Sequence, residues 1–577
     1  MLGRPALGYQ NYEEVITENI FYIDKTHFIK EWWEYGDKVT LITRPRRFGK
    51  TLNMSTVECF FSNKYAGRGD LFEGKSIWSE KSPDGDYKYR QLQGTFPVIF
   101  LSFASVKTGD VAGIKTAVKK IISNVYREYR EMMTSEEFND MDRAYFDKMI
   151  YDMSDDMAYT SINSLCIYLE NHYCKKVIVL LDEYDTPMQE AWLAGNWDQA
   201  VEFFRSFFNA TFKTNDHIYR GIITGITRIS KESIFSDLNN LKVVTTTSDK
   251  YASCFGFLEE EVFAAIDEKG LGNEKQGVKR WYDGFIFGTH TDIYNPWSII
   301  SFIENNAKYD AYWSNTSGNG LVNALIQKGT PDIKQTMEKL LKGGSFVTKI
   351  DEQIVFSQLN DDAAAVWSLL LATGYLKVLG LKRIGNSDAD EFDEEGDVWY
   401  TLAITNFEVK KMFRKMIIGW FGGRAKSAYN DFIKALLIDD KKAMNRYMNR
   451  VALATFSYFD TGNKPSEYAE PERFYHGFVL GLMVELSDRY AMTSNRESGF
   501  GRYDVMLEPL NESDDAIIME FKVYDPDDEK TLDDTVAAAL SQLEQKRYSA
   551  VLEAKGIELK RIRKYGFAFQ GKECRIG

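Results

Sequence analysis

Residues 41–52, Leu-Ile-Thr-Arg-Pro-Arg-Arg-Phe-Gly-Lys-Thr-Leu, constrain this chain more than any other segment. An apolar run at residues 39–42 leads into a tight turn that ends in Gly49-Lys50-Thr51, and residues 52–61 are predicted to be a helix. This strand–loop–helix context is that of a phosphate-binding P-loop, where backbone N–H groups and the helix N-terminus cradle phosphates. We therefore expect Lys50 to reach the β- and γ-phosphates of a nucleotide, and the Thr51 hydroxyl to hold Mg²⁺.

One position departs from the P-loop pattern. The motif Gly-x-x-x-x-Gly-Lys-Ser/Thr has its first glycine where this chain has Arg44. Gly-Lys-Thr alone recurs by chance, and an ordinary loop that caps a helix would look similar. The strand before the turn and the helix after it favour the P-loop.

A second motif ends a run of five apolar residues in two carboxylates, Asp182 and Glu183. Open α/β sheets bind ligands at the carboxyl ends of their strands. Asp182 is placed to hold Mg²⁺ through water, and Glu183 to polarise an attacking water. The alternative is that the pair only starts a helix. The presence of Gly49-Lys50-Thr51 upstream favours the second half of an ATPase site.

Residues 219–228 are predicted to form another strand with polar residues near its end. Thr224 is a candidate sensor of the γ-phosphate, and Arg228 a candidate to neutralise charge in the transition state. A strand end with a surface arginine remains an equal alternative. Because continuous apolar strands alternate with helices here, we expect a parallel sheet covered on both faces.

The middle of the chain is predicted to be mainly helical. Residues 257–310 form helices around a central turn at 281–288, and residues 311–460 are mostly helical. A helix at 367–377 followed by a strand at 398–402 fits either a winged helix or a plain helical connector. The sequence alone leaves these two interpretations open.

Three polar residues interrupt apolar strands near the C-terminus. Asp504 lies in a strand at 502–507, and Glu520 and Lys522 lie two apart in a strand at 516–523, so these two face the same way. Two carboxylates beside an ammonium suit Mg²⁺-dependent phosphodiester hydrolysis. A cross-strand salt bridge is the alternative. Gln542, on a helix predicted at 535–548, points toward the same edge.

Composition narrows the cellular setting and the partners. The 577 residues allow two to four domains, and the net charge of −14 argues against a broad basic surface but leaves room for a local basic groove. Five scattered cysteines are typical of reduced thiols in a cytosol. The five histidines do not cluster, which argues against a zinc site. No apolar run is long enough to span a membrane, and no signal peptide is evident, so a cytoplasmic protein is expected.

Both ends of the chain resemble one known family. Residues 22–26, 44–51, 181–185 and 224–228 are similar to bacterial AAA-ATPase-like proteins, which tolerate arginine at the position of Arg44. Residues 472–522 resemble the PD-(D/E)XK nuclease domain fused to the C-terminus of those proteins, with Tyr503-Asp504 in place of the motif's Pro-Asp. The resemblance implies a bacterial intracellular protein that binds ATP, and it adds Arg46 and Arg47 to the nucleotide site. It also implies helical accessory roles for Glu472, as a metal ligand, and for Gln542.

We therefore predict an α/β protein with three parts. A P-loop NTPase domain with a parallel sheet spans residues 1–260, a helical lid or winged-helix connector spans 261–464, and a restriction-endonuclease-like α/β domain spans 465–577. The expected cofactors are ATP and Mg²⁺, with Mn²⁺ also suited to the C-terminal site, and the expected partner is nucleic acid, DNA being favoured; the chain is compatible with an oligomer. The leading hypothesis is ATP-regulated DNA cleavage. The alternatives are an ATPase switch whose nuclease-like domain binds nucleic acid without cutting, and an interaction protein that uses nucleotide only structurally.

Overall fold

The computed structural model describes most of the chain. It describes residues 3–577 except 82–83, 229–233, 236–237, 314–319, 352–358, 360–361, 385–396, 421–423, 460–477, 480, 483, 497–502, 527–528, 546–547 and 571–572. The predicted accessory residue Glu472 therefore lies outside the described residues. Two compact units make up the fold: residues 1–316 with 347–409, and residues 317–346 with 410–577. The domain boundaries proposed from the sequence remain predictions.

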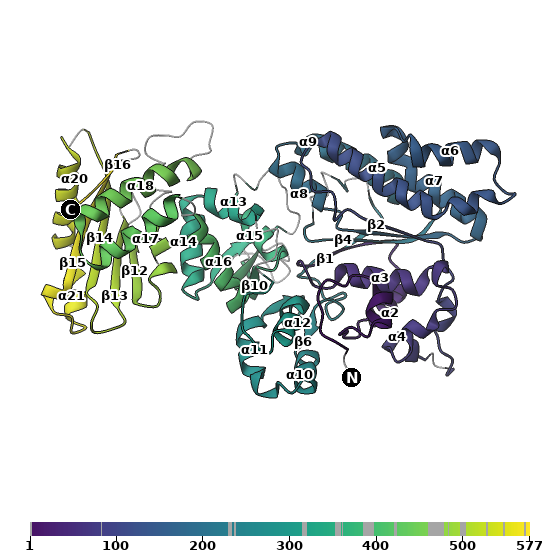
Figure 1. The fold of residues 1–577 in the computed structure, drawn as a ribbon, viewed down its shortest axis with the longest axis horizontal. Coiled ribbons are helices and arrows are strands. Elements are labelled where there is room, and N and C mark those ends of the chain that lie inside the picture. The colour runs from purple at the N-terminus through teal and green to yellow at the C-terminus, as the bar shows by residue number, and fades with distance from the viewer. Residues whose placement is uncertain are drawn as a thin grey trace, which may run out of the picture. The chain divides into compact units, whose positions relative to one another are not determined.

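The first unit is built on a five-stranded parallel sheet in the order β2-β3-β4-β1-β5. Strands β1 and β3 are buried along their whole length and β4 over residues 221–225, as expected of a parallel sheet with two covered faces. Figure 1 shows α2, α3 and α4 on one side of this sheet and α5, α7 and α9 on the other. The strands are β1 (Val39–Thr43), β2 (Val98–Ser102), β3 (Val177–Asp182), β4 (Ile218–Gly225) and β5 (Leu241–Val244).

Nine helices are described around this sheet, and the one predicted after the P-loop lies close to its predicted position. The helix after the P-loop, α3 (Lys50–Phe61), starts two residues before its prediction because Gly49 is its N-cap. Amphipathic α5 (Val111–Glu128) buries one face, and Asp110 caps it by accepting a hydrogen bond from the Gly113 N–H. The others are α1 (Tyr12–Thr17), α2 (His27–Tyr35), α4 (Ser76–Ser79), α6 (Asp140–Tyr151), α7 (Asp155–Tyr173), α8 (Thr186–Leu193) and α9 (Trp197–Phe208).

The rest of the first unit adds two small sheets. Residues 257–310 contain α10 (Glu259–Glu268), α11 (Lys275–Tyr282) and α12 (Pro296–Glu304), but the predicted central turn is instead a hairpin of β7 (Phe285–Phe287) and β8 (His290–Tyr294), joined by β6 (Phe257–Leu258). Aromatic and β-branched residues explain the strands there. A second sheet has the order β10-β11-β9: β9 (Phe346–Lys349) precedes α15 (Ala363–Ala372), and β10 (Leu376–Ile384) and β11 (Asp397–Ile404) follow it.

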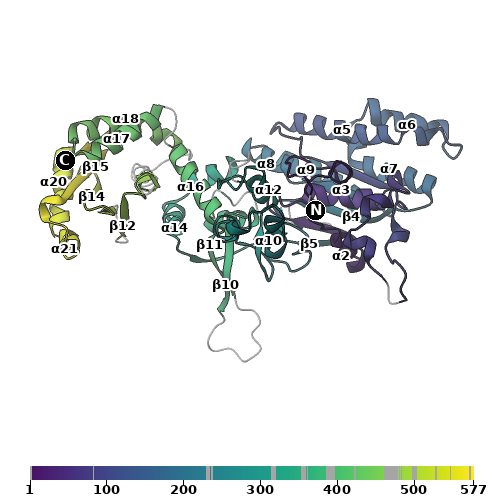
Figure 2. The same ribbon diagram turned by 60° about the horizontal axis from the view of Figure 1, so that its bottom comes forward.

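The helix and the hairpin follow one another in the predicted order, and the choice between a winged helix and a helical connector stays a prediction. Strands β10 and β11 pair antiparallel directly after α15, and β9 lies on the far side of β11. Figure 2 shows the hairpin standing out from the body of the first unit. Leu379 and Leu381 on β10 are more than half exposed.

The second unit combines helices with a five-stranded mixed sheet in the order β12-β13-β14-β15-β16. Only β14 and β15 are parallel, because α20 and α21 cross over between them. At the edge, Asn445 and Asn449 of α18 each exchange two hydrogen bonds with the backbone of β16, which pairs an edge that would otherwise be open. The strands are β12 (Tyr490–Arg496), β13 (Tyr503–Pro509), β14 (Ala516–Val523), β15 (Ile562–Gln570) and β16 (Glu573–Ile576). The helices are α13 (Gly320–Lys328), α14 (Pro331–Leu341), α16 (Phe407–Trp420, which begins in the first unit), α17 (Arg424–Leu437), α18 (Lys441–Phe459), α20 (Leu532–Gln545) and α21 (Tyr548–Glu553).

Candidate functional site

The loop between β1 and α3 has the backbone conformation of a phosphate-binding turn. Gly49 caps α3 with a φ of +82°, in the left-handed region that favours glycine. The space where a Cβ would stand is open, so the backbone conformation rather than crowding requires glycine there. The loop thus delivers the N-terminus of a twelve-residue helix to the carboxyl edge of the sheet, where anions bind.

Lys50 is held at this loop by the loop's own backbone. The side chain is buried, and its Nζ donates hydrogen bonds of 2.9 Å to the carbonyl oxygens of Arg44 and Pro45. Burial lowers the pKa of Lys50, while the nearby carboxylates Glu183 and Asp182 act in the opposite direction. An ammonium so placed can exchange carbonyl oxygens for phosphate oxygens with little movement.

Asp182 brings three elements together at the end of β3. Its Oδ2 accepts a 2.7 Å hydrogen bond from the Thr51 hydroxyl on α3, and its Oδ1 accepts a short one from the Thr224 hydroxyl on β4. The position of β4 between β1 and β3 explains why Thr224 reaches this carboxylate. Burial raises the pKa of Asp182, and the two hydroxyl donors oppose that rise. The trio offers carboxylate and hydroxyl oxygens, the ligands that Mg²⁺ prefers.

Glu183 adopts a backbone conformation that is costly for a residue with a Cβ. Its φ of +51° lies in the left-handed region, and its carboxylate accepts a 3.1 Å hydrogen bond from the Thr186 hydroxyl. Such strain costs of order 1–3 kcal/mol and concentrates at functional sites. It turns the chain sharply between β3 and α8, beside Asp182. The role of Glu183 as the water-polarising group remains a prediction.

Arg44, which departs from the P-loop pattern, is a buried anchor. Its guanidinium donates to the carbonyl oxygens of Thr43 (3.0 Å) and Thr245 (2.6 Å), and to that of Lys250 (3.2 Å). It also lies over the ring of Phe287 at 4.6 Å. Burial lowers the pKa of Arg44 to about 10. The side chain therefore connects the start of the P-loop to the segment after β5. A glycine at this position has no side chain and could not make these contacts.

Arg46 and Arg47, expected at the nucleotide, contact neighbouring aromatic residues in this conformation. The Arg47 guanidinium lies 3.4 Å from the ring centroid of Trp297, and its φ is +64°. The carbonyl oxygen of Arg46 accepts hydrogen bonds from Asn295 (3.3 Å) and from the Trp313 indole (3.1 Å). The P-loop is thus held from its outer side by α12 and by Trp313. Their contact with nucleotide remains a prediction.

Asp185 is a structural carboxylate that the sequence reading did not single out. It is fully buried and accepts hydrogen bonds from the N–H groups of Ile226 (3.0 Å) and Thr227 (2.9 Å), from the Thr227 hydroxyl (2.8 Å) and from Gln189 (2.9 Å). Burial raises the pKa of Asp185 against these donors. The residue fixes the backbone that leads from β4 to Arg228. Its position two residues after Glu183 is the sequence feature that points to its role at the site.

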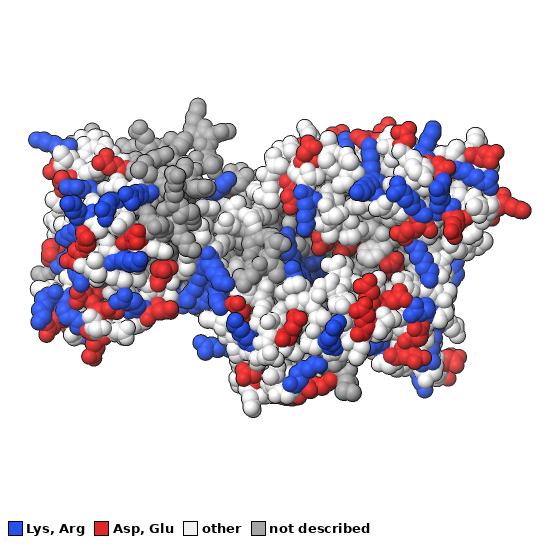
Figure 3. All heavy atoms as spheres, in the orientation of Figure 1, with Lys and Arg blue, Asp and Glu red and all other residues white. Residues whose placement is uncertain are grey.

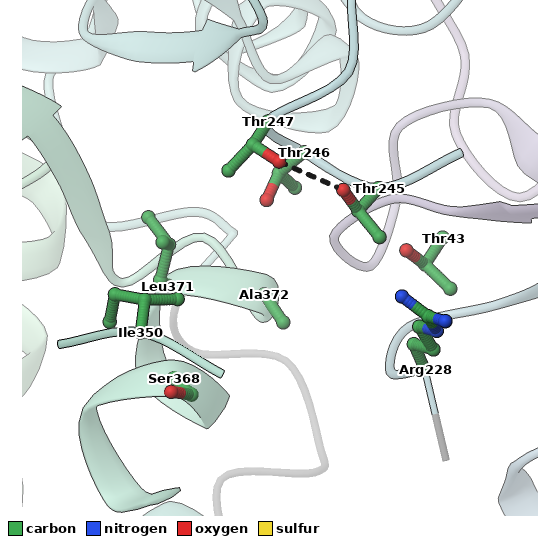
Figure 4. Close-up of a pocket in the computed structure, with 9 residues that line it drawn as sticks. All are labelled: Thr43, Arg228, Thr245, Thr246, Thr247, Ile350, Ser368, Leu371 and Ala372. Carbon is green, nitrogen blue, oxygen red and sulfur yellow. Dashed lines mark hydrogen bonds between the residues drawn. The ribbon is translucent and has the colours of Figure 1, made fainter. Parts of the chain in front are cut away.

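Arg228 lines a pocket at the carboxyl end of β1 in the first unit. Figure 4 shows its side chain beside Thr43, with Leu371 and Ala372 of α15 on the other side of the pocket. Thr245, Thr246 and Thr247, which follow β5, complete the polar wall, and a 3.0 Å hydrogen bond joins Thr245 to Thr247. Arg228 therefore lies close in space to the residue before the P-loop. Its action on a phosphate remains a prediction.

In the second unit, the structure pairs the strands that carry the C-terminal candidates. Asp504 on β13 lies directly opposite Glu520 on β14 in the antiparallel register. Glu520 is fully buried, and neither of its carboxylate oxygens has a hydrogen-bond partner among the described residues. The Nε2 atom of Gln542, buried on α20, likewise has none there. Lys522 is half-buried on the face of β14 that carries Glu520.

An unpaired buried carboxylate calls for a compensating charge. Leaving an ionised group buried without a partner costs several kcal/mol, and such groups are normally paired or bound to metal. A divalent cation bound by Glu520 would satisfy both of its carboxylate oxygens. The residues of this site therefore fit a metal.

Comparison with known proteins finds one family match in each of the two regions that carry these candidate sites. Residues 6–235 match the family model of a predicted AAA-ATPase, and residues 470–577 match that of the PD-(D/E)XK nuclease superfamily. The chain joins an AAA-ATPase-like domain to a PD-(D/E)XK nuclease-superfamily domain. The predicted resemblance and the α/β fold class are thereby confirmed. One relative, described as an uncharacterized protein in the vnfD 5' region of Azotobacter chroococcum mcd 1, is 23% identical over 417 residues, which cover 71% of this chain and 69% of that protein.

The AAA-ATPase-like domain contains the P-loop, Asp182, Thr224 and Arg228, and the nuclease-superfamily domain contains Asp504, Glu520, Lys522 and Gln542. Charged side chains of both signs are interspersed over the face shown in Figure 3. Among the described helices, none combines the length and the apolar character needed to cross a membrane.

Proposed function

We propose that this protein binds and hydrolyses ATP with Mg²⁺ at the P-loop and cleaves DNA at a second metal site, and that ATP controls the cleavage. The observation that carries the proposal is the pair of pre-built oxygen sites. One consists of Asp182 with Thr51 and Thr224, and the other is the unpaired buried carboxylate of Glu520 opposite Asp504. The two domain matches support an ATPase joined to a nuclease-like domain.

At the ATP site, each residue has a distinct task. The helix N-terminus after Gly49 and the Lys50 ammonium bind phosphate oxygens, and Thr51 and Asp182 hold Mg²⁺, which offsets phosphate charge when bound. Glu183 accepts the proton of the attacking water or orients it, and Arg228 stabilises charge that develops on the γ-phosphate. Thr224 keeps Asp182 in place through its hydrogen bond.

At the nuclease site, Asp504 and Glu520 hold the cation, with Glu472 as a further ligand. A bound Mg²⁺ or Mn²⁺ activates water and polarises the phosphodiester. Lys522 positions the water or stabilises charge on the phosphate, and Gln542 orients one of these groups from α20. DNA is the favoured substrate because the fold superfamily is one of nucleases and the site is a local one.

The test is metal-dependent cleavage of supercoiled, linear and single-stranded DNA by the full chain. Asp504→Ala and Glu520→Ala should each abolish cleavage and weaken metal binding, whereas Lys522→Ala should abolish cleavage and leave metal binding largely intact, because lysine is not a ligand. All three should keep the ATPase activity. Cleavage by the Asp504→Ala, Glu520→Ala double variant at the wild-type rate would refute the nuclease assignment. DNA binding without cleavage by the wild type would instead support the non-cutting switch.

A further inference from the structure

Three side chains with three different metal-binding atoms meet beside the P-loop. His27 and Glu31 lie one turn apart on the same face of α2, and Cys254 lies in the segment between β5 and β6. A ring nitrogen of His27, a carboxylate oxygen of Glu31 and the sulfur of Cys254 are all within 4.8 Å of one another. None of the three takes part in the ATP or nuclease site.

We propose that His27, Glu31 and Cys254 bind one divalent cation of the zinc class. Zn²⁺ takes cysteine sulfur, histidine nitrogen and carboxylate oxygen, usually in tetrahedral geometry. Mg²⁺ and Ca²⁺ select all-oxygen sites, so the mixed donor set discriminates against the cation that serves the ATP site. Water can supply the fourth ligand of a tetrahedral site.

Burial at this cluster disfavours every ionised side chain in the absence of a cation. Cys254 is fully buried, which raises the pKa of its thiol well above the usual value, and burial also raises the pKa of Glu31 and lowers that of His27. A cation of charge +2 bound by one thiolate, one carboxylate and one neutral imidazole forms a neutral set. Such a set can be buried at far lower cost than its separate charges.

The surrounding charges are consistent with a bound thiolate. Burial and the Glu31 carboxylate raise the pKa of the Cys254 thiol, whereas nearby cations, Arg44 among them, lower it. The other nearby cation, Lys25, is already neutralised by an ion pair of 2.7 Å with Glu261, and its ammonium also donates to the carbonyl oxygen of Ser253. Repulsion of the metal by Lys25 is therefore offset.

The site is connected to the P-loop through short contacts. The Asn53 amide on α3 donates a 2.8 Å hydrogen bond to the carbonyl oxygen of Cys254, and the N–H of Gly256 donates to the carbonyl oxygen of Phe48 at 3.2 Å. A cation at Cys254 would cross-link α2 to the segment that supports the P-loop. The bound cation thus has a structural role: it restricts the motion of the segment that contacts the nucleotide-binding loop. Sequence spacing does not reveal it, because more than two hundred residues separate Glu31 from Cys254.

The experiment uses the untagged full chain, stripped of metal and then titrated with Zn²⁺ against a chromophoric chelator, and separately with Co²⁺. We expect one Zn²⁺ ion per chain to bind at the site formed by His27, Glu31 and Cys254. We expect the Co²⁺ complex to show a thiolate-to-metal charge-transfer band and the visible bands of tetrahedral coordination. Cys254→Ser should remove the charge-transfer band. His27→Gln and Glu31→Gln should each weaken Zn²⁺ binding at this site by more than the about 10–100-fold that loss of an outer-shell partner costs.

The matched control is Cys174→Ser, because Cys174 is the exposed cysteine among the five and should leave the band unchanged. Cobalt bound at Asp182 or Glu520 has oxygen ligands and gives no thiolate band, so the result is independent of the proposed ATPase and nuclease activities. Absence of the band in the wild type, or an unchanged band in Cys254→Ser, would overturn the proposal. If Cys254→Ser fails to fold, unchanged Zn²⁺ affinity in both His27→Gln and Glu31→Gln would overturn it equally.

Discussion

The hydroxyl of Thr51 donates a 2.7 Å hydrogen bond to the carboxylate of Asp182, so the P-loop helix is in direct contact with the end of β3. These residues are 131 positions apart in the chain. Their contact depends on the parallel sheet, which brings the carboxyl ends of β1 and β3 to one edge. The arrangement supplies two of the oxygens that a nucleotide-bound Mg²⁺ requires.

Lys50→Ala should greatly weaken binding of Mg²⁺-ATP. The ammonium is the buried cation of the loop, and its removal takes away a charge-assisted hydrogen bond to phosphate, worth about 1.5–3 kcal/mol or about 10–150-fold in affinity. Isothermal titration calorimetry gives the comparison. Lys64→Ala, a change on the short helix after α3, is the control and should bind as wild type. Equal affinity in Lys50→Ala and wild type would contradict the P-loop assignment.

Glu183→Gln should keep ATP binding but slow hydrolysis. The amide preserves the size of the side chain and its contact with Thr186, but it is a far weaker base for the attacking water. Loss of general-base action typically costs 10²–10⁴-fold in rate. Phosphate release under saturating ATP, together with calorimetric affinity, separates the two effects. If Glu183→Gln turned over ATP at the wild-type rate, this residue would have a different role.

Arg228→Ala should lower kcat for ATP more than it weakens ATP binding. The side chain lies in the pocket beside Thr43, at the end of the strand that enters the P-loop, where it can stabilise charge that develops only in the transition state. Steady-state kinetics alongside binding affinity is the measurement. Arg205→Ala on α9 serves as a comparison on a neighbouring element. If Arg228→Ala hydrolysed ATP at the wild-type rate, Arg228 would be a surface residue at a strand end without a role in hydrolysis.

Glu58→Gln should stabilise the protein above neutral pH. Burial on α3 raises the pKa of Glu58 to about 7, against about 4.3 when exposed, although Lys64 acts to lower it. The stability that goes with this raised pKa is therefore fully present below about pH 4.3 and is lost as the pH rises through about 7. We expect a gain of order 1–3 kcal/mol at pH 8 that shrinks toward pH 5, measured by thermal unfolding. An equal gain at both pH values, or the same gain in the exposed variant Glu136→Gln, would contradict the burial of this charge.

The regular parts of the fold were predictable from sequence because their patterns are local. The apolar run of β3, the alternation of polar and apolar residues in β14 around Glu520 and Lys522, and the glycine before α3 each determine one element. None of these local patterns predicts the order of the five strands, because that order depends on the face of the sheet over which each connecting helix crosses. The hairpin at residues 285–294 was taken as a turn between helices because its strands are short and rich in aromatic residues.

The sequence points to a site residue only where binding a phosphate or a cation requires a particular type of side chain. Lys50, Thr51 and Asp182 follow from the requirements of a phosphate and a cation. The buried role of Arg44 did not, because its partners are backbone carbonyl oxygens that any sequence provides. No local sequence pattern predicts that Trp297 and Trp313 contact the P-loop.

The central claim is that nucleotide at the P-loop controls a metal-dependent nuclease in the same chain. The most direct measurement is the initial rate of DNA cleavage with Mg²⁺, with and without ATP, for the wild type, Lys50→Ala and Glu520→Ala. We predict that ATP changes the wild-type rate, that Lys50→Ala cleaves at a rate which ATP leaves unchanged, and that Glu520→Ala does not cleave. Cleavage by Glu520→Ala at the wild-type rate, or an equal response of the wild type and Lys50→Ala to ATP, would contradict the account.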